Sequence, residues 1–342
     1  MIPKISVCVP VYNVQEYIGE CAVSLFEQTL KEIEFVFVDD CSTDNSMDIL
    51  HRILQKYPER QESVTILKHP VNQGLGAARN TAIEYLRNHS RSEYIIHCDS
   101  DDFIEKDMYE KMYRTAVNCQ ADLVYCDYNR IKQNRMEWTA IRKYGGQADT
   151  PDGLLNDFFS RQYIGSLWNK LVKRDIVMMD YSQVCLPHIS YREDILRLSF
   201  MLRNCKTVAH CPGFLYNYRI RSNSYVRNFT RNLQSQLQSL EVMEILHTHF
   251  TQVQYQNALN TMRRHALYIA INIPGFPADK WKKMYPEVKK GIWSDKRYSL
   301  PFKFIFTLAR MNFPLAVKLY DLGKKIARKL QRANFKSNSK RD

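Results

Sequence analysis

The first 130 residues alternate between short apolar runs and longer segments with helical spacing. Each apolar run is five to seven residues long, as expected for strands that are buried on both faces of a parallel sheet. Between them, apolar residues recur every three or four positions, which is typical of amphipathic helices. The alternation predicts βαβ units. The expected strands are Ile5–Val11, Glu34–Val38, Val64–Lys68, Tyr94–Cys98 and Asp122–Tyr128, and the expected helices are Tyr17–Gln28, Ser46–Lys56, Leu75–Leu86 and Met108–Cys119.

The pattern changes twice further along the chain. Residues 150–221 are less regular and contain short helical segments, whereas the chain after residue 228 is mostly helical. We therefore expect an α/β domain over residues 1–228, in two halves of about 1–130 and 131–228, followed by a helical region over 229–342. In that region we expect helices at Leu233–Phe250 and Tyr255–Ile271, a break at Pro274–Pro277, and a last, basic helix.

Composition narrows the class of protein. The chain has 342 residues, enough for a substantial core, and its composition is that of an ordinary globular protein. The N-terminus does not resemble a secretory signal, and no run of 18 apolar residues is present. The nine cysteines are scattered without a CxxC pair, which favours reduced thiols in the cytosol over a zinc or redox motif.

The positive charge is concentrated at the C-terminal end. Residues 289–342 hold 15 basic and 3 acidic side chains, whereas the rest of the chain, with a net charge of +1, is almost neutral. A basic amphipathic helix favours contact with an anionic membrane, and a helix packed on the body with a solvated basic face is the alternative. The apolar stripe consists of Leu315, Leu319, Leu322, Ile326 and Leu330, and we expect Phe302, Phe304, Phe306 and Phe313 to deepen the contact.

Three acidic residues follow the fourth expected strand. Asp99, Asp101 and Asp102, with Ser100 among them, would lie at the carboxyl end of that strand, the edge where open α/β sheets bind ligands. Carboxylates this close repel one another unless a cation holds them together, and oxygen ligands suit Mg²⁺ or Mn²⁺. The alternative is an acidic turn that caps the next helix.

The other strand ends are also polar. Strand one ends in Pro10-Val11-Tyr12-Asn13, strand two in Asp39-Asp40-Cys41-Ser42-Thr43-Asp44, and strand three leads into Asn72-Gln73-Gly74 and Ala78-Arg79-Asn80. Such an edge could form a nucleotide pocket, in which a carboxylate accepts a base N–H and a glycine turn, a helix N-terminus and Arg79 face phosphates. Taken singly, Asp39-Asp40 could also form a turn with an N-cap, and the glycines could only shape a tight turn.

These four blocks together, in this order and spacing, resemble glycosyltransferase family 2, and in particular its bacterial surface-polysaccharide members. The resemblance covers about the first 130 residues and implies an inverting enzyme with a GT-A fold, a Rossmann-like, mainly parallel sheet with helices on both faces. Cys41 stands where the family usually has glycine. The half up to about residue 130 would then bind the nucleotide, and residues 131–228 would face the acceptor.

The resemblance also implies roles for single residues. Pro10, Tyr12 and Asn13 would line the nucleotide, with Tyr12 on the base, and Asn72 and Gly74 would belong to the same site. Asp40 would accept the uracil N3–H, Arg79 would help hold the base or the diphosphate, Asp99 would lie at the ribose, and Ser100 would belong to the same nucleotide site. Asp101 would bind Mn²⁺ or Mg²⁺, and Asp99 and Asp102 would share that role.

The catalytic base is expected further along. Tyr191-Arg192-Glu193-Asp194 resembles the Glu-Asp pair of the family, with Arg192 in place of the usual glycine. Asp194 would be the general base and Glu193 the alternative, whereas on bare sequence the two acids could simply begin a helix. We expect Asp194 to have an ordinary carboxylate pKa. Trp168-Asn169-Lys170-Leu171 and Tyr216-Asn217-Tyr218-Arg219 also resemble surface-polysaccharide members, although Trp168 and Tyr218 could be ordinary core aromatics.

The resulting prediction is transfer of a sugar from a nucleotide-sugar, such as a UDP-sugar, to a hydroxyl of a glycan or a lipid-linked acceptor. A sugar-nucleotide nucleotidyltransferase is the alternative enzyme, and a nucleic-acid-binding protein is disfavoured because the body is neutral and lacks such a motif. We expect a cytoplasmic protein in peripheral contact with the cytoplasmic face of the inner membrane.

Overall fold

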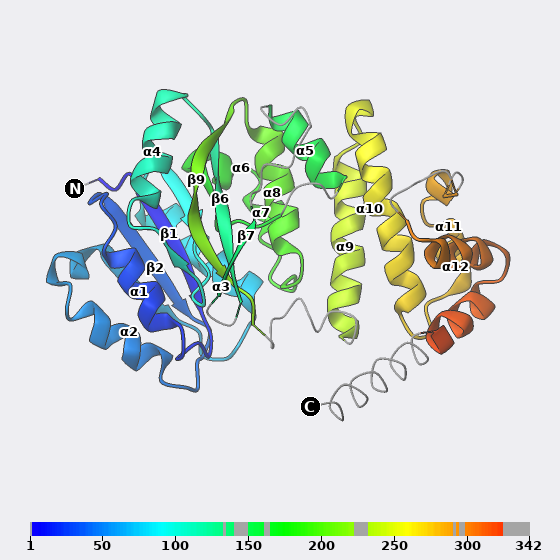
Figure 1. Cartoon of the computed structure of the whole chain (residues 1–342), viewed down its shortest axis with the longest axis horizontal. Coiled ribbons are helices and arrows are strands. Elements are labelled where there is room, and N and C mark those ends of the chain that lie inside the picture. The colour runs from blue at the N-terminus through cyan, green and yellow to red at the C-terminus, as the bar shows by residue number, and fades with distance from the viewer. Residues whose placement is uncertain are drawn as a thin grey trace.

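The computed structural model describes residues 2–132, 135–139, 150–160, 165–221, 232–289, 292–293 and 298–323. In these parts the chain forms an α/β domain at its N-terminal end and a helical region at its C-terminal end (Figure 1). The domain boundary expected near residue 228 falls outside the described residues, so it stays a prediction.

The strands expected in the first half are confirmed. They are β1 (Ile5–Val11), β2 (Ile33–Asp39), β3 (Val64–Lys68), β4 (Tyr94–His97) and β6 (Leu123–Lys132). The first four lie side by side and parallel in the order β3-β2-β1-β4. Every residue of β1 is buried, because the strand lies inside the sheet with both faces covered.

The helices of this half also follow the pattern of the sequence. They are α1 (Ile18–Phe26), α2 (Ser46–Leu54), a 3₁₀ turn η1 (Pro58–Ser63), α3 (Leu75–His89) and α4 (Met108–Asn118). Helix α3 packs on β1 and β2, and α4 packs on β6 and β9. Each buries the apolar face that its spacing predicts, as Met108, Met112 and Ala116 do in α4.

Four strands that the sequence did not predict complete the sheet in the described residues. They are β5 (Phe103–Ile104), β7 (Arg135–Thr139), β8 (Lys170–Lys173) and β9 (Val208–Arg219). Strand β8 inserts between β4 and β6 and is antiparallel to both, whereas β9 runs parallel to β6. The predicted α/β sheet is therefore confirmed, with a parallel core that the later strands turn into a mixed sheet.

Helices surround and extend this sheet. Those of the middle segment are α5 (Pro151–Phe159), α6 (Arg174–Met179), α7 (Tyr181–Val184) and α8 (Glu193–Asn204). Helix α8 contacts α5, α6 and α7 as well as α9 (Leu233–His249), so it joins the sheet domain to the helical region. Beyond α9 lie α10 (Val253–Asn272), α11 (Ala278–Lys283), the 3₁₀ turn η3 (Pro286–Lys289), α12 (Leu300–Met311) and a helical segment at 313–323.

The C-terminal aromatic residues correct part of the sequence interpretation. Phe306 and Phe313 are buried in the protein and pack against Trp281, so the expectation that they contact a membrane was wrong. Phe302 is partly buried, and only Phe304 of this set is exposed. Leu315, Leu319 and Leu322 are exposed, whereas Ile326 and Leu330 lie outside the described residues. No helix in the described ranges is long and apolar enough to span a bilayer.

Candidate functional site

The carboxyl ends of β1, β2 and β4 meet at one edge of the sheet because these strands are parallel neighbours. This edge brings together the loop after β1, Asp39 and Asp40 after β2, and the acidic cluster after β4. The polar strand ends predicted from the sequence are thus assembled in one region of the fold, as expected for an open α/β sheet.

Asp102 is fully buried below this edge. One carboxylate oxygen accepts a hydrogen bond from the Tyr216 hydroxyl at 2.7 Å, and the other accepts one from the Arg219 backbone N–H at 2.7 Å. The Tyr216 hydroxyl in turn accepts a hydrogen bond from the backbone N–H of Asp99 at 3.2 Å. Asp102 therefore ties the acidic loop to β9, and both of its oxygens are already engaged.

Asp99 and Asp101 are the two acids of the cluster that reach solvent. Their side chains are 24% and 16% exposed, and each contacts an arginine at 2.5 Å, Arg79 for Asp99 and Arg221 for Asp101. Burial and the neighbouring charge of Asp99 raise the pKa of Asp101, while Arg221 opposes the shift. Two carboxylates whose repulsion is only partly compensated have the oxygen donors that a hard cation prefers.

The donor set fits Mg²⁺ or Mn²⁺ bound jointly with a substrate. No group of three or more His, Cys, Asp or Glu residues in the described parts of the chain is arranged to hold a metal. Mg²⁺ is commonly held by one or two carboxylates together with substrate phosphates and water, so a pair of acids is sufficient. Asp99 and Asp101 are consequently the residues that fit the expected metal, with Asp102 occupied elsewhere.

Asp40 organises the loop between β3 and α3. Its carboxylate accepts hydrogen bonds from the backbone N–H groups of Gln73 at 2.8 Å and Gly74 at 2.7 Å, and it lies 2.7 Å from the His69 ring. The Asn72 side chain donates to the Asp40 carbonyl at 3.4 Å. The structure therefore brings Asp40, Asn72 and Gly74 together, with both Asp40 oxygens already engaged by this loop, as those of Asp102 are by β9. Contact of these residues with a base stays a prediction.

The loop after β1 lies beside the loop after β2. Asn13 accepts a hydrogen bond from the Thr43 backbone at 2.8 Å and has a φ of 49°. Cys41, in the loop after β2, also has a positive φ, 64°, the left-handed conformation that explains the glycine usual at this position. Tyr12 is 46% exposed, so its ring is available to a ligand, whereas Pro10 and Ser100 are buried.

Arg79 links the acidic edge to the predicted base. The guanidinium donates to Asp99 at 2.5 Å and to Glu193, the first residue of α8, and it is only 4% exposed. Burial alone would lower the pKa of Arg79, but the charges of Asp99 and Glu193 outweigh it and raise that pKa. Arg79 is thus a buried, permanently charged bridge between β4 and α8.

The next residue strengthens the same link. Asn80 accepts a hydrogen bond from Arg197, which lies one turn after Glu193 in α8 and is almost fully buried. Arg79 and Asn80 of α3 therefore hold two successive turns of α8. The sequence assigned this block to the nucleotide, and it gave no signal that the partner of Asn80 would be Arg197.

The glycines of this segment allow α3 to approach the loop before α8. A Cβ at Gly76 would lie 2.1 Å from the carbonyl oxygen of Ile189, and one at Gly74 would lie 2.5 Å from the Ser190 hydroxyl. Gly74 also has a φ of 90°, which favours glycine. Both glycines are thus required for the close contact between the start of α3 and residues 189–190.

Asp194 lies in the first turn of α8 and is partly buried. Burial, reinforced by the adjacent charge of Glu193, raises the pKa of Asp194 to about 7, while Arg79 opposes the shift. The expectation of an ordinary carboxylate pKa was therefore wrong, because the sequence does not show how strongly the fold desolvates this position. Arg192 caps the helix with a φ of 64°, which explains the glycine usual there.

A residue of α9 that the sequence did not single out fixes the loop before Asp194. Gln238 accepts hydrogen bonds from the backbone N–H groups of Ser190 at 3.3 Å and Tyr191 at 3.0 Å, and it donates to the His188 carbonyl. It is buried together with Ser235 and Ser239, three and one positions away. In the sequence, the only sign of this role was that these polar residues share one face of α9 with its buried apolar residues.

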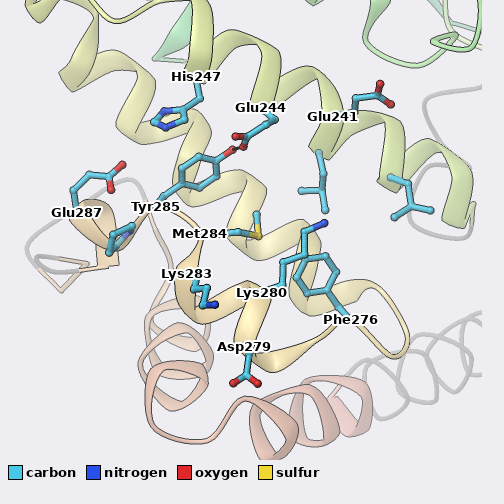
Figure 2. A pocket seen from close by; sticks show the side chains of 13 residues that line it. Glu241, Glu244, His247, Phe276, Asp279, Lys280, Lys283, Met284, Tyr285 and Glu287 are labelled. Carbon is cyan, nitrogen blue, oxygen red and sulfur yellow. Dashed lines mark hydrogen bonds between the residues drawn. The ribbon is translucent and has the colours of Figure 1, made fainter.

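A separate cavity opens in the helical region. It has a volume of about 890 Å³ and lies between α9, α11 and η3, with Glu244, Lys280, Lys283 and Tyr285 among its lining residues (Figure 2). The Tyr285 hydroxyl donates to Glu244 at 3.0 Å. None of the predicted site residues lines this cavity, so its size alone does not identify it as the active site.

Trp168 packs against two tyrosines of β9, one of which contacts the acidic loop. Its ring is buried and stacks on Tyr216 at 4.2 Å and on Tyr218 at 5.8 Å between ring centroids. Since Tyr216 contacts both Asp99 and Asp102, this stack holds the acidic loop in place. The interpretation of Trp168 and Tyr218 as structural aromatics agrees with these contacts.

Comparison with solved structures identifies the class of fold. The crystal structure of S. aureus TarS 1-349 aligns with a TM-score of 0.62 at 17% identity, covering 94% of this chain and 92% of that one. A crystal structure of the same TarS fragment in complex with UDP-GlcNAc aligns with a TM-score of 0.56. The predicted GT-A fold with a helical C-terminal region is therefore confirmed.

Sequence comparison then gives the family. Residues 6–178 match glycosyl transferase family 2, which is more than half of the chain, so the chain belongs to this family. It is 33% identical over 237 residues to the putative glycosyltransferase EpsH of Bacillus subtilis, covering 68% of this chain and 65% of the length of EpsH. It is also 28% identical over 229 residues to the putative teichuronic acid biosynthesis glycosyltransferase TuaG of Bacillus subtilis, covering 66% of this chain and 82% of TuaG.

Proposed function

We propose that this protein is an inverting, metal-assisted glycosyltransferase that moves a sugar from a UDP-sugar to a hydroxyl of a glycan or a lipid-linked acceptor. The observation that carries the proposal is the Arg79 bridge, which joins Asp99 at the acidic edge to Glu193 beside Asp194. It couples a site suited to a nucleotide diphosphate with a carboxylate suited to be a base. The nucleotide site alone, or the buried carboxylate alone, would be compatible with several classes of protein.

The proton-transfer step depends on Asp194. A general base works best when its pKa lies near the working pH, and burial raises the pKa of Asp194 to about 7. Its carboxylate would take the proton from the acceptor hydroxyl as that oxygen attacks the anomeric carbon and the bond to UDP breaks. One base without a protein nucleophile implies a single displacement, hence inversion of the anomeric centre.

The donor would lie along the edge formed by the ends of β1, β2 and β4. Asp40, Asn72 and Gly74 would receive the base, Tyr12 would cover it, and Asp99 would lie at the ribose. Asp99 and Asp101 would hold Mg²⁺ or Mn²⁺, which when bound offsets negative charge on the leaving diphosphate. The bound donor of the TarS fragment, UDP-GlcNAc, supports a UDP-sugar as the first candidate.

The names of the relatives support a role in bacterial cell-surface polysaccharide synthesis, since TuaG is assigned to teichuronic acid. UDP-sugars are cytoplasmic metabolites, so we place the reaction in the cytoplasm, at the inner face of the membrane if the acceptor is lipid-linked. The nine free cysteines agree with a reducing compartment.

Thermal shift with a panel of UDP-sugars tests the donor and the metal together. We expect one UDP-sugar to raise the melting temperature in the presence of Mn²⁺ or Mg²⁺ and to do so much less after chelation. Asp101→Asn should abolish the metal-dependent part of the shift. Asp107→Asn, which removes an exposed carboxylate that pairs with Lys111, is the matched control and should leave the shift unchanged.

Product analysis separates this function from the alternative enzyme. The proposal predicts release of UDP in the presence of an acceptor, and slow release by hydrolysis in its absence. Release of pyrophosphate from UTP and a sugar phosphate would instead identify a nucleotidyltransferase. Retention of metal-dependent turnover near the wild-type rate in Asp101→Asn would overturn the metal assignment.

A further inference from the structure

The two C-terminal helical segments present large apolar side chains to solvent. Six of the 16 exposed large hydrophobic residues of the described chain fall within residues 300–322. Leu300, Phe304 and Met311 lie four and seven positions apart in α12, so they share one face of that helix. Leu315, Leu319 and Leu322 have a similar spacing in the helical segment 313–323. We call these six residues the C-terminal surface.

The opposite faces of both segments are already packed on the protein. Phe306 of α12 and Phe313 contact Trp281 of α11, with ring centroids 5.8 and 5.3 Å apart. Phe302 and Tyr320 contact Tyr268 of α10 at 5.1 and 5.6 Å. The inner faces thus pack both segments onto the protein, whereas the outer apolar residues are exposed and do not belong to this core.

These two segments lie away from the proposed catalytic edge, which is the edge of the sheet formed by the carboxyl ends of β1, β2 and β4. Figure 1 shows α12 and the helical segment after it at the end of the molecule opposite the sheet, beyond α9 and α10. A partner bound to the C-terminal surface would therefore not compete with a nucleotide at the ends of β1, β2 and β4.

Charge indicates the kind of partner. The exposed Arg310 and Lys318 lie in the same two segments, and the sequence from 324 to 342 adds eight basic residues and one acidic residue. The whole stretch 289–342 has a net charge of +12, while the remaining chain has +1. Two copies brought together through this region would repel each other, whereas an anionic bilayer offers both negative headgroups and an apolar interior.

We propose that the C-terminal surface binds the surface of an anionic lipid bilayer. The apolar side chains enter the boundary between headgroups and acyl chains, and the neighbouring lysines and arginines contact the anionic headgroups. The binding is peripheral and reversible, because the apolar residues form outer faces of surface helices and not a spanning segment. It goes beyond the proposed transfer reaction and does not depend on it.

Co-sedimentation with vesicles of phosphatidylcholine containing 30% phosphatidylglycerol tests the proposal on the full chain. We expect strong binding to these vesicles at low salt, at least tenfold weaker binding to pure phosphatidylcholine, and weakening of the anionic-vesicle binding by 0.5 M NaCl. The triple variant Leu315→Gln, Leu319→Gln, Leu322→Gln should bind at least tenfold more weakly than the wild type. Equal binding of this variant and the wild type would overturn the proposal.

Matched controls come from exposed apolar residues elsewhere in the chain. Met179→Gln and Val253→Gln remove side chains that are 63% and 87% exposed, outside the C-terminal surface, and should bind vesicles as the wild type does. A second copy as the true partner would give a wild-type dimer in lipid-free sedimentation and a monomeric triple variant, which also overturns the proposal.

A fold and function check accompanies the test. The triple variant should keep its melting temperature and its donor-dependent thermal shift, since the three leucines are exposed and distant from the catalytic edge. If the wild type binds vesicles but no UDP-sugar raises its melting temperature, only the proposed transferase function is refuted. If a UDP-sugar raises its melting temperature but it does not bind vesicles, only the membrane contact is refuted.

Discussion

The guanidinium of Arg79 donates a hydrogen bond to the carboxylate of Glu193, which lies 114 positions further along the chain. The same guanidinium donates to Asp99, so one buried cation fixes the distance between the acidic edge and the first turn of α8. In the proposed reaction this distance sets the position of Asp194 relative to the donor. A misplacement of about 1 Å in such a site can lower the rate by about two orders of magnitude.

Replacing Arg79 should therefore affect both stability and catalysis. Arg79→Met leaves Glu193 buried without its cation, and breaking a buried ion pair in this way costs about 3–5 kcal/mol of unfolding free energy. Chemical denaturation measures the loss. Arg114→Met is the control, because Arg114 is 73% exposed in its pair with Glu110 and should cost less than about 1 kcal/mol. Equal losses in the two variants would contradict the bridging role.

The activity of the enzyme should rise with pH through about 7. The base must be ionised to accept a proton, and burial raises the pKa of Asp194 to about 7, so the basic form is lost below neutrality. We expect kcat/KM to fall about tenfold for each pH unit below that value. Asp194→Asn should lower kcat by about 10²-fold or more and keep donor binding, measured by thermal shift. Loss of donor binding would indicate a structural residue instead.

The raised pKa of Asp194 also predicts that the free energy of unfolding falls as the pH rises. This is the opposite of the effect of a carboxylate whose pKa is lowered by an ion pair. The pKa of Asp194 is about 7 in the folded protein and near the ordinary aspartate value of 3.8 in the unfolded chain, so the folded state binds the proton more tightly. The stabilising contribution is complete below pH 4 and is lost as the pH rises toward 7. Asp194→Asn should therefore gain stability relative to the wild type across this window. An unchanged difference between pH 4 and pH 8 would contradict the assigned pKa.

Gly76→Ala should impair catalysis by moving the loop before Asp194. Its Cβ would lie 2.1 Å from the Ile189 carbonyl oxygen, a backbone atom that can yield only if the loop shifts. We expect a fall in kcat of at least tenfold and a lower melting temperature. Gly19→Ala is the matched control: Gly19 is also helical, and its Cβ would make an ordinary contact at 3.5 Å. A Gly76→Ala enzyme with wild-type kcat would show that this close approach is not needed.

Restoring the family glycine at residue 41 should stabilise the protein. Cys41 has a φ of 64°, which costs a residue with a Cβ about 1–2 kcal/mol, and the entropic cost of glycine offsets part of this gain. Cys41→Gly should therefore add about 0.5–1 kcal/mol to the unfolding free energy in urea. Cys119→Gly, at an exposed position with a φ of −93°, should not stabilise. A loss of stability in Cys41→Gly would indicate that the thiol has a role of its own.

The local pattern of the sequence determined the first half of the fold. Strands β1 and β3 begin and end where the apolar runs do, and α2, α3 and α4 begin at the predicted residues. This part was predictable because a parallel sheet covered on both faces requires continuous apolar strands, and each amphipathic helix shows its own period. The order of the polar blocks also sufficed to identify the family and to place Asp40, Asp99 and Asp101 at one edge.

The later strands depended on tertiary structure. Strand β8 is only four residues long and gains its stability by pairing with both β4 and β6, which no local pattern of Lys170–Lys173 reveals. Strand β9 contains Pro212 and Gly213, which interrupt the alternation expected of a strand, and the register with β6 shifts near that point.

The chemistry of the site was decided in the same way. The sequence supplies Arg79, Glu193 and Asp194 as residue types, but a pKa depends on burial and on charges that lie close only after folding. The fold pairs Arg79 with Glu193, leaves Asp194 desolvated beside that pair, and engages both oxygens of Asp102 in hydrogen bonds. The sequence by itself thus determined which side chains gather at the candidate site, and only the tertiary contacts decided which of them are already engaged by the protein.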